Sequence, residues 1–116
     1  MADLDVTLAL NAAADQLGLR KFTGVIQSKD SFYAEHEPKR MPVKQQLLEN
    51  WETWQQATAL CSEMEAAILF VLARKLGVRA GGIMVVGISS QDLDNLIRTA
   101  IRGAEILIQQ EREVVR

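Results

Sequence analysis

The sequence predicts an α/β fold, with helices packed on a sheet, and three observations lead to it. Apolar residues recur at helical spacing in some segments and in short strand-like runs in others, and the two kinds alternate along the chain. Near its centre lie eight unbroken apolar residues, Ala66–Ala73, directly after a turn that carries two carboxylates. Because a bilayer span needs roughly 20 such residues, this run is typical of a helix buried in a protein core.

Composition and charge narrow the class of protein. The chain has 116 residues, of which 48% are hydrophobic and 24% charged, and its net charge is −2. These values predict a single globular domain over residues 1–116, with neither nucleic acid nor a membrane as partner. The single cysteine, Cys61, cannot form an internal disulfide, and no Cys/His cluster suggests a bound metal. The first five residues lack the features of a signal peptide, so a cytoplasmic location is expected.

The first third of the chain predicts a helix, a strand and a loop. The helix lies between Asp3 or Asp5, either of which can cap its start, and Gly18, which can end it. A strand is expected over residues 21–28. The run from Lys29 to Pro42 is polar and rich in titratable groups, and it contains two prolines, so an irregular loop is expected there.

The rest of the chain continues the alternation. A second helix is expected from Val43, a short strand over residues 58–61, and a strand that is apolar on both faces over residues 78–88. The sheet would then have about three strands. Ser89 or Ser90 can cap a long last helix. Its apolar stripe, expected to face inward, consists of Leu93, Leu96, Ile97, Ala100, Ile101, Ala104 and Ile108.

The turn before the central helix is the candidate functional site. Ser62 and Glu65 have the spacing of a capping box, which predicts that the helix begins near Glu63. Capping accounts for Glu65 but leaves Glu63 without a role, and an ionised carboxylate at a buried helix needs a partner. The turn and the loop over residues 29–42 both follow strands, so both are expected at one crevice beyond the carboxyl ends of the sheet.

Four segments carry a resemblance to a known family. They are Gln-Ser-Lys-Asp-Ser-Phe-Tyr at residues 27–33, Met41-Pro42, Ser-Glu-Met-Glu-Ala-Ala at residues 62–67, and Gly-Val-Arg-Ala-Gly at residues 77–81. In order and spacing they resemble the uridine phosphorylase branch of the nucleoside phosphorylases. The resemblance implies part of a three-layer αβα sandwich with a mixed sheet. It also implies phosphorolysis of a pyrimidine nucleoside to the free base and ribose 1-phosphate, with inorganic phosphate as co-substrate and no other cofactor.

The resemblance also implies roles for individual residues. By position, Glu65 resembles the glutamate that holds the ribose hydroxyls, Met64 the methionine beside the sugar, and Glu63 the acid that lines the same pocket. Phe32 resembles the aromatic residue against the base, and Glu35 stands where the family has the glutamine that reads uracil. An ionised carboxylate cannot supply the amide donor, which leaves the base preference open. No residue is assigned a catalytic role, and no metal site is expected.

Other departures from the family leave alternatives open. The resemblance covers the C-terminal half of the family's chain, so the glycine-rich phosphate loop and its arginines have no counterpart, and Arg40 and Arg79 are not expected to replace them. The chain alone is therefore expected to be inactive, and its partner is either a complementing N-terminal half or further copies of itself. The alternative is a catalytically inactive homologue that acts as a nucleoside-binding or oligomeric interaction module. A third reading is an unrelated α/β domain that matches by coincidence.

Overall fold

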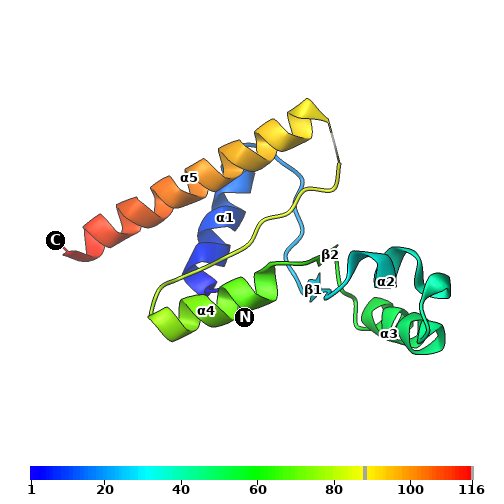
Figure 1. Cartoon of the computed structure of the whole chain (residues 1–116). Coiled ribbons are helices and arrows are strands. Elements are labelled where there is room, and N and C mark those ends of the chain that lie inside the picture. Colours follow the sequence, from blue (N-terminus) through cyan, green and yellow to red (C-terminus); the bar gives the residue numbers. More distant parts are fainter. Residues whose placement is uncertain (88, 116) are drawn as a thin grey trace. The chain divides into compact units, whose positions relative to one another are not determined.

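The computed structural model describes residues 1–87 and 89–115 and has an α/β fold, as predicted (Figure 1). Its sheet is small, and helices make up most of the chain. The elements are α1 (Leu4–Gln16), β1 (Gln27–Ser28), α2 (Phe32–His36), the 3-10 helix η1 (Pro38–Arg40), α3 (Lys44–Gln56), β2 (Ser62–Glu63), α4 (Ala66–Leu76) and α5 (Ser90–Val115).

The chain divides into two compact units. One consists of Met1–Lys21 together with Leu69–Arg116, and the other is Phe22–Ile68. The expectation of a single domain over residues 1–116 stays a prediction. No helix in the described part of the chain is both long and apolar enough to cross a membrane.

In the first unit, α1 packs against α5 through small residues (Figure 1). Ala13 on α1 and Thr99 on α5 are 0% and 1% exposed. A Cβ atom added to Gly103 would lie 2.8 Å from Leu10 Cδ2, so the backbone of α5 approaches α1 closely at this point. The predicted start of α1 is confirmed, because the Asp3 carboxylate accepts the Val6 N–H at 3.1 Å.

The long helix α5 begins where the sequence predicted, but its predicted inward stripe is wrong. The Ser89 hydroxyl accepts the Asp92 N–H at 3.0 Å, which caps the start. Most of the predicted stripe is exposed: Leu93, Ile97, Ile101 and Ile108 each keep about half of their surface in solvent. The predicted stripe follows the spacing of the large apolar residues, whereas α1 packs where small side chains permit the closest approach.

The sheet is shorter than predicted. Parallel β1 and β2 pair with Gln27 opposite Ser62 and Ser28 opposite Glu63. The strand expected over residues 21–28 is therefore reduced to its last two residues. The strand expected over residues 58–61 is displaced to Ser62–Glu63, because Thr58 adopts a left-handed turn with φ of 58°.

The strand expected over residues 78–88 is also wrong as far as the structure describes it. Residues 78–87 are irregular, and Ile88 lies outside the described residues. A strand needs a neighbour to complete its hydrogen-bond ladder. Here the Ala80 carbonyl instead accepts the Asp3 N–H at 2.8 Å, in a single bond to the start of α1.

In the second unit, the segment expected to be an irregular loop is partly helical. Ser31 caps α2 by accepting the Ala34 N–H at 3.3 Å, and Pro38 starts η1. The second predicted helix is confirmed as α3, which contacts both α2 and η1. The polar composition of residues 29–42 concealed these short helices, because capping residues are themselves polar.

Candidate functional site

The two parallel strands bring the candidate site residues to one edge of the sheet. β1 and β2 end at Ser28 and Glu63, which lie opposite one another, and the Lys29 N–H donates to the Glu63 carbonyl at 2.8 Å. The segment after β1 contains Phe32 and Glu35, which are predicted to contact the base. The segment after β2 contains Met64 and Glu65, which are predicted to contact the ribose. Both segments thus follow the carboxyl ends of neighbouring parallel strands, as predicted, and the crevice expected between them stays a prediction.

Glu63 caps α4, and the predicted capping box is wrong. The helix begins at Ala66 rather than near Glu63. The Glu63 carboxylate accepts the N–H groups of Glu65 and Ala66, each at 2.6 Å, and it accepts the Ser28 hydroxyl. Ser28 Oγ in turn accepts the Ala67 N–H at 3.0 Å. These donors are the free N–H groups at a helix start, and a carboxylate satisfies them more strongly than a hydroxyl.

This environment changes the acidity of Glu63. Burial by itself raises the pKa of the carboxyl. The hydrogen bonds from Ser28, Ala66 and Glu65 and the positive charge of Lys29 outweigh burial, so the pKa of Glu63 lies below its ordinary value. The carboxylate is therefore ionised at neutral pH and holds the turn in place.

Met64 and Glu65 lie in the turn that Glu63 fixes. Met64 is 41% exposed, and Glu65 is exposed as well. The Glu65 carboxylate accepts the Met64 N–H at 3.2 Å through one oxygen. Since a carboxylate has about four lone-pair positions, most of its acceptor capacity is left for a ligand. The turn therefore presents an ionisable oxygen pair next to an apolar thioether.

A second cluster joins the base-side segment to β2. Lys29 Nζ lies 3.3 Å from Glu35 Oε1 and 2.9 Å from Ser62 Oγ, and Ser62 Oγ lies 2.9 Å from both Glu35 oxygens. The side chains of Lys29 and Glu35 are only 11% and 12% exposed. Because the two charges are mutually paired and hydrogen-bonded to a hydroxyl, they are tolerated at this burial.

Lys29, Ser62 and Ser28 are the site residues that the sequence predictions missed. Lys29 follows a strand directly, and Glu35 comes six residues later. This spacing is only a weak signal for an ion pair, because the two side chains meet only when the segment between them forms the start of α2. Ser62 was assigned to the capping box, whereas it bonds to Glu35. Sequence separation hid the contact of Ser28 with Glu63, which depends on the register of the two strands.

Phe32 lies beside the paired charges. Lys29 Nζ is 5.6 Å from the centroid of its ring, and the His36 ring is 4.2 Å away at an angle of 32°. Phe32 is nevertheless 51% exposed, so about half of its surface is accessible to a ligand. The structure thus brings Phe32 and Glu35 together on α2, and it places Met64 and Glu65 in the turn after β2.

A cavity of about 220 Å³ lies in the same unit, next to the two strands. Trp51 and Trp54 of α3 line it together with Gln27 and Cys61. Gln27 Oε1 is buried without a hydrogen-bond partner. Burial, followed by the negative charge of Glu63, raises the pKa of the Cys61 thiol.

The two arginines considered for phosphate are both paired with carboxylates. Arg40 bonds to Glu37, and Arg79 bonds to Glu111 and lies 3.8 Å from Asp5. Among the residues that the structure describes, no cluster of His, Cys, Asp and Glu is arranged to hold a metal ion.

Comparison with known proteins places this α/β chain in a family. The family model of the phosphorylase superfamily matches residues 1–110. The chain belongs to that superfamily, and its relatives place it in the uridine phosphorylase branch, so the resemblance in the sequence is confirmed.

The relatives include uridine phosphorylases. That of Treponema pallidum is 38% identical over 121 residues, which cover 94% of this chain and 47% of the relative. That of Thermococcus kodakarensis is 41% identical over 88 residues, which cover 74% of this chain and 32% of the relative. A guanosine phosphorylase of Halorubrum lacusprofundi is 37% identical over 103 residues, which cover 89% of this chain and 36% of the relative. The chain thus spans less than half the length of these curated relatives.

Proposed function

We propose that this chain forms the nucleoside-binding half of a uridine phosphorylase-like enzyme, a pentosyltransferase. In the reaction, an oxygen of inorganic phosphate forms a bond to C1′ of the ribose while the bond from C1′ to the base nitrogen breaks. The electron pair of that bond leaves with the base, which takes up a proton, and the products are free base and ribose 1-phosphate. The observation that carries the proposal is the turn of exposed Met64 and Glu65, fixed by Glu63 at the carboxyl ends of two parallel strands.

Glu65 is proposed to hold the ribose. Its carboxylate can accept the hydroxyls of the sugar, which orients C1′ toward phosphate. As the bond to the base breaks, the sugar gains oxocarbenium-like positive charge, and a nearby carboxylate then interacts more favourably with it. Met64 would cover the apolar face of the sugar. Glu63 lines the same turn and positions Glu65, since it holds the Glu65 N–H at 2.6 Å.

Phe32 and Glu35 are proposed to contact the base. The exposed part of the Phe32 ring can contact a planar base. Glu35 retains acceptor capacity beyond its contacts with Lys29 and Ser62, so it can accept an N–H of the base. Similarity to both uridine and guanosine phosphorylases supports a nucleoside and leaves the preferred base as a further question.

The proposal includes a partner that supplies the phosphate site. Arg40 and Arg79 are paired with carboxylates, and the relatives are more than twice as long as their matched parts. We therefore assign phosphate binding to a complementing N-terminal half, in whose presence the three-layer sandwich and its mixed sheet would be completed. Further copies of the chain are the other proposed partner. The proposal also includes a cytoplasmic location.

Substitution of Glu65 tests the proposal. We expect Glu65→Gln to weaken uridine binding by about tenfold or more, because charge-assisted hydrogen bonds contribute roughly 1.5–3 kcal/mol. The stability of the chain should hardly change, since Glu63 provides the helix cap. Calorimetric titration of the wild type, of Glu65→Gln and of the exposed control Glu52→Gln measures this. Equal affinities of the wild type and Glu65→Gln, or no binding by either, would refute the proposed sugar site.

A further inference from the structure

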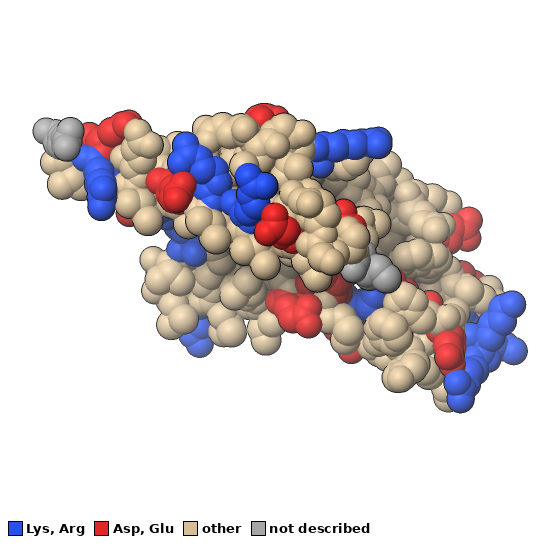
Figure 2. All heavy atoms as spheres, turned by 90° about the horizontal axis from the view of Figure 1, so that it is seen from above, with Lys and Arg blue, Asp and Glu red and all other residues tan. Residues whose placement is uncertain are grey.

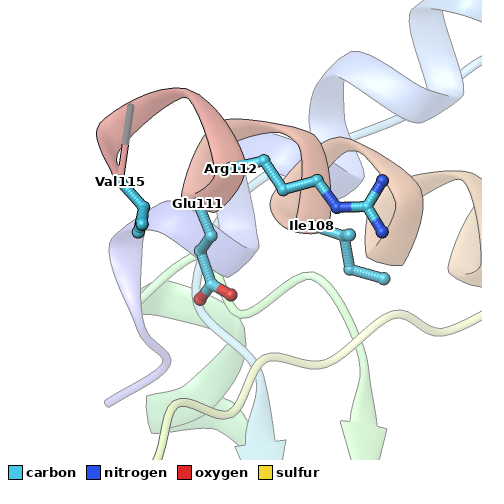
Figure 3. A pocket seen from close by; sticks show the side chains of 4 residues that line it. All are labelled: Ile108, Glu111, Arg112 and Val115. Atoms are coloured by element: carbon cyan, nitrogen blue, oxygen red, sulfur yellow. The ribbon is translucent and has the colours of Figure 1, made fainter.

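Lys29 carries a positive charge that the protein largely encloses. Its side chain is 11% exposed, whereas those of Arg79 and Arg40, which also pair with carboxylates, are 39% and 77% exposed. Figure 2 shows many other charged side chains on the surface that faces the viewer. Glu111 and Arg112, beside a shallow hollow of about 380 Å³ at the end of α5, are exposed as well (Figure 3). Since the cost of desolvating two charges offsets their attraction, the enclosed ion pair of Lys29 adds little net stability, which indicates another role.

The ammonium group of Lys29 contacts both segments of the candidate site. On α2, it lies 3.3 Å from Glu35 Oε1, 3.5 Å from His36 Nε2 and 5.6 Å from the centroid of the Phe32 ring. On β2, it donates to Ser62 Oγ at 2.9 Å. Ser62 Oγ in turn lies 2.9 Å from both Glu35 oxygens and donates to that carboxylate. The ammonium, the hydroxyl and the carboxylate therefore form a closed triangle of contacts between the helix and the strand.

The helix α2 depends on contacts with other elements for its position. It has five residues, and isolated helices of that length are unstable in water. Phe32 and Tyr33 are 51% and 60% exposed. The helix contacts α3 and η1, which follow it in the chain, whereas the triangle of Lys29, Ser62 and Glu35 connects it to β2. The ammonium therefore helps to set where α2 lies relative to the strand.

Loss of the ammonium would affect the two segments of the site differently. The Glu35 side chain is 12% exposed, and without its cationic partner the carboxylate would be driven toward water, because an enclosed ionised group needs a partner. Since α2 is short, movement of Glu35 would also move Phe32. The turn at Met64 and Glu65 would stay in place, because Glu63 holds it through separate hydrogen bonds.

We propose that Lys29 is a positioning residue, which fixes α2 against the edge of the sheet so that Phe32 and Glu35 meet the base. The inference rests on the proposed function, because it takes these two residues as the base contacts and Glu65 as the ribose contact. Lys29 itself does not contact the substrate, since its three N–H groups already have partners. It acts through α2 and determines how the bound ribose and the base contacts are aligned.

The first experiment compares uridine with methyl β-D-ribofuranoside, which has the sugar but lacks the base. NMR titration of the intact chain measures both affinities. We expect Lys29→Met to weaken uridine binding by about tenfold, the value of one aromatic contact and one hydrogen bond, and to leave riboside binding unchanged. Glu65→Gln should weaken the binding of both ligands. The matched control Lys39→Met, which changes an exposed lysine of η1, should bind both like the wild type.

The second experiment follows α2 in the absence of a ligand. The Glu37 N–H closes the helix by donating to the Tyr33 carbonyl at 2.8 Å, so its hydrogen exchange reports whether α2 is held. Lys29→Met should speed this exchange by about threefold or more, whereas exchange within α4 should match the wild type. Circular dichroism shows whether the variant folds. If it does not fold, Lys29→Gln, which keeps a polar group beside Glu35, takes its place with the same expectations.

Three results would overturn the proposal. Where the wild type binds uridine, these are unchanged uridine binding by Lys29→Met and an equal loss of uridine and riboside binding. The third is unchanged exchange of the Glu37 N–H. Failure of the wild type to bind either ligand would instead refute the proposed function, and the exchange measurement would still decide whether Lys29 positions α2.

Discussion

Glu35 illustrates how one side chain can set the preference of a binding site. Its carboxylate is held by Lys29 and Ser62, so its position is fixed while its chemistry is limited to accepting hydrogen bonds. Lys29 offers no substitute donor, because its ammonium group already lies next to Glu35 and Ser62 and within 3.5 Å of His36 Nε2. Uracil presents two carbonyl oxygens around its N–H, and these need donors.

We therefore expect Glu35→Gln to tighten uridine binding by about three- to tenfold, the value of one neutral hydrogen bond. The same change should lower the free energy of unfolding by on the order of 1 kcal/mol, because Lys29 loses its ion-pair partner. Calorimetric titration with uridine and urea unfolding measure the two effects. The matched control is Glu37→Gln, whose pairing with Arg40 lies on the surface. Weaker uridine binding by Glu35→Gln would contradict the expected gain and would show that the negative charge of Glu35 is needed to hold the base.

At the level of elements, the start of α4 connects stability to the proposed site. The two strands hold Ser28 opposite Glu63, and Glu63 in turn holds the N–H groups of Glu65 and Ala66. Loss of this cap should loosen the turn that presents Glu65. It should also make the stability of the chain depend on pH, because the pKa of Glu63 is lower in the folded chain.

The sign of that dependence follows from the lowered pKa. The contribution of Glu63 to the free energy of unfolding is complete above its unfolded pKa of about 4.3 and is lost as the pH falls through the folded-state pKa. We expect Glu63→Gln to lower stability at pH 7 by about 1 kcal/mol, as for loss of a helix cap, and to match the wild type in strong acid. Urea unfolding across this pH range is the measurement. Glu65→Gln serves as control and should track the wild type; a constant difference for Glu63→Gln at every pH would contradict the capping role.

The sequence predicted helices better than strands, and the reason is physical. Helices α1, α3 and α5 are defined by local spacing and caps such as Asp3 and Ser89, which the sequence displays directly. Strands depend on a distant neighbour, so residues 78–87 carry a strand-like composition yet are irregular here. The contacts of Ser28 and Lys29 in the site likewise depend on strand register, which local patterns do not specify.

At the level of the whole molecule, the two compact units bury few large side chains. The buried apolar residues of the described chain are alanines, and many leucines, isoleucines and valines remain exposed. Val71 and Leu76 of α4 are 65% and 74% exposed, and Val86 is 91% exposed. Exposed apolar surface on this scale is typical of a chain that associates. This observation agrees with the two proposed partners, a complementing half and a second copy.

The most direct test of the central proposal is phosphate-dependent release of uracil from uridine. The chain would be assayed alone and after mixing with the N-terminal half of the Treponema pallidum uridine phosphorylase. We expect no release by the chain alone, release of uracil and ribose 1-phosphate by the mixture, and loss of that activity with Glu65→Gln. Activity of the chain alone near that of a full-length relative would contradict the assignment of the phosphate site to a partner. A stable complex of the two halves that releases no uracil would contradict the proposed function itself.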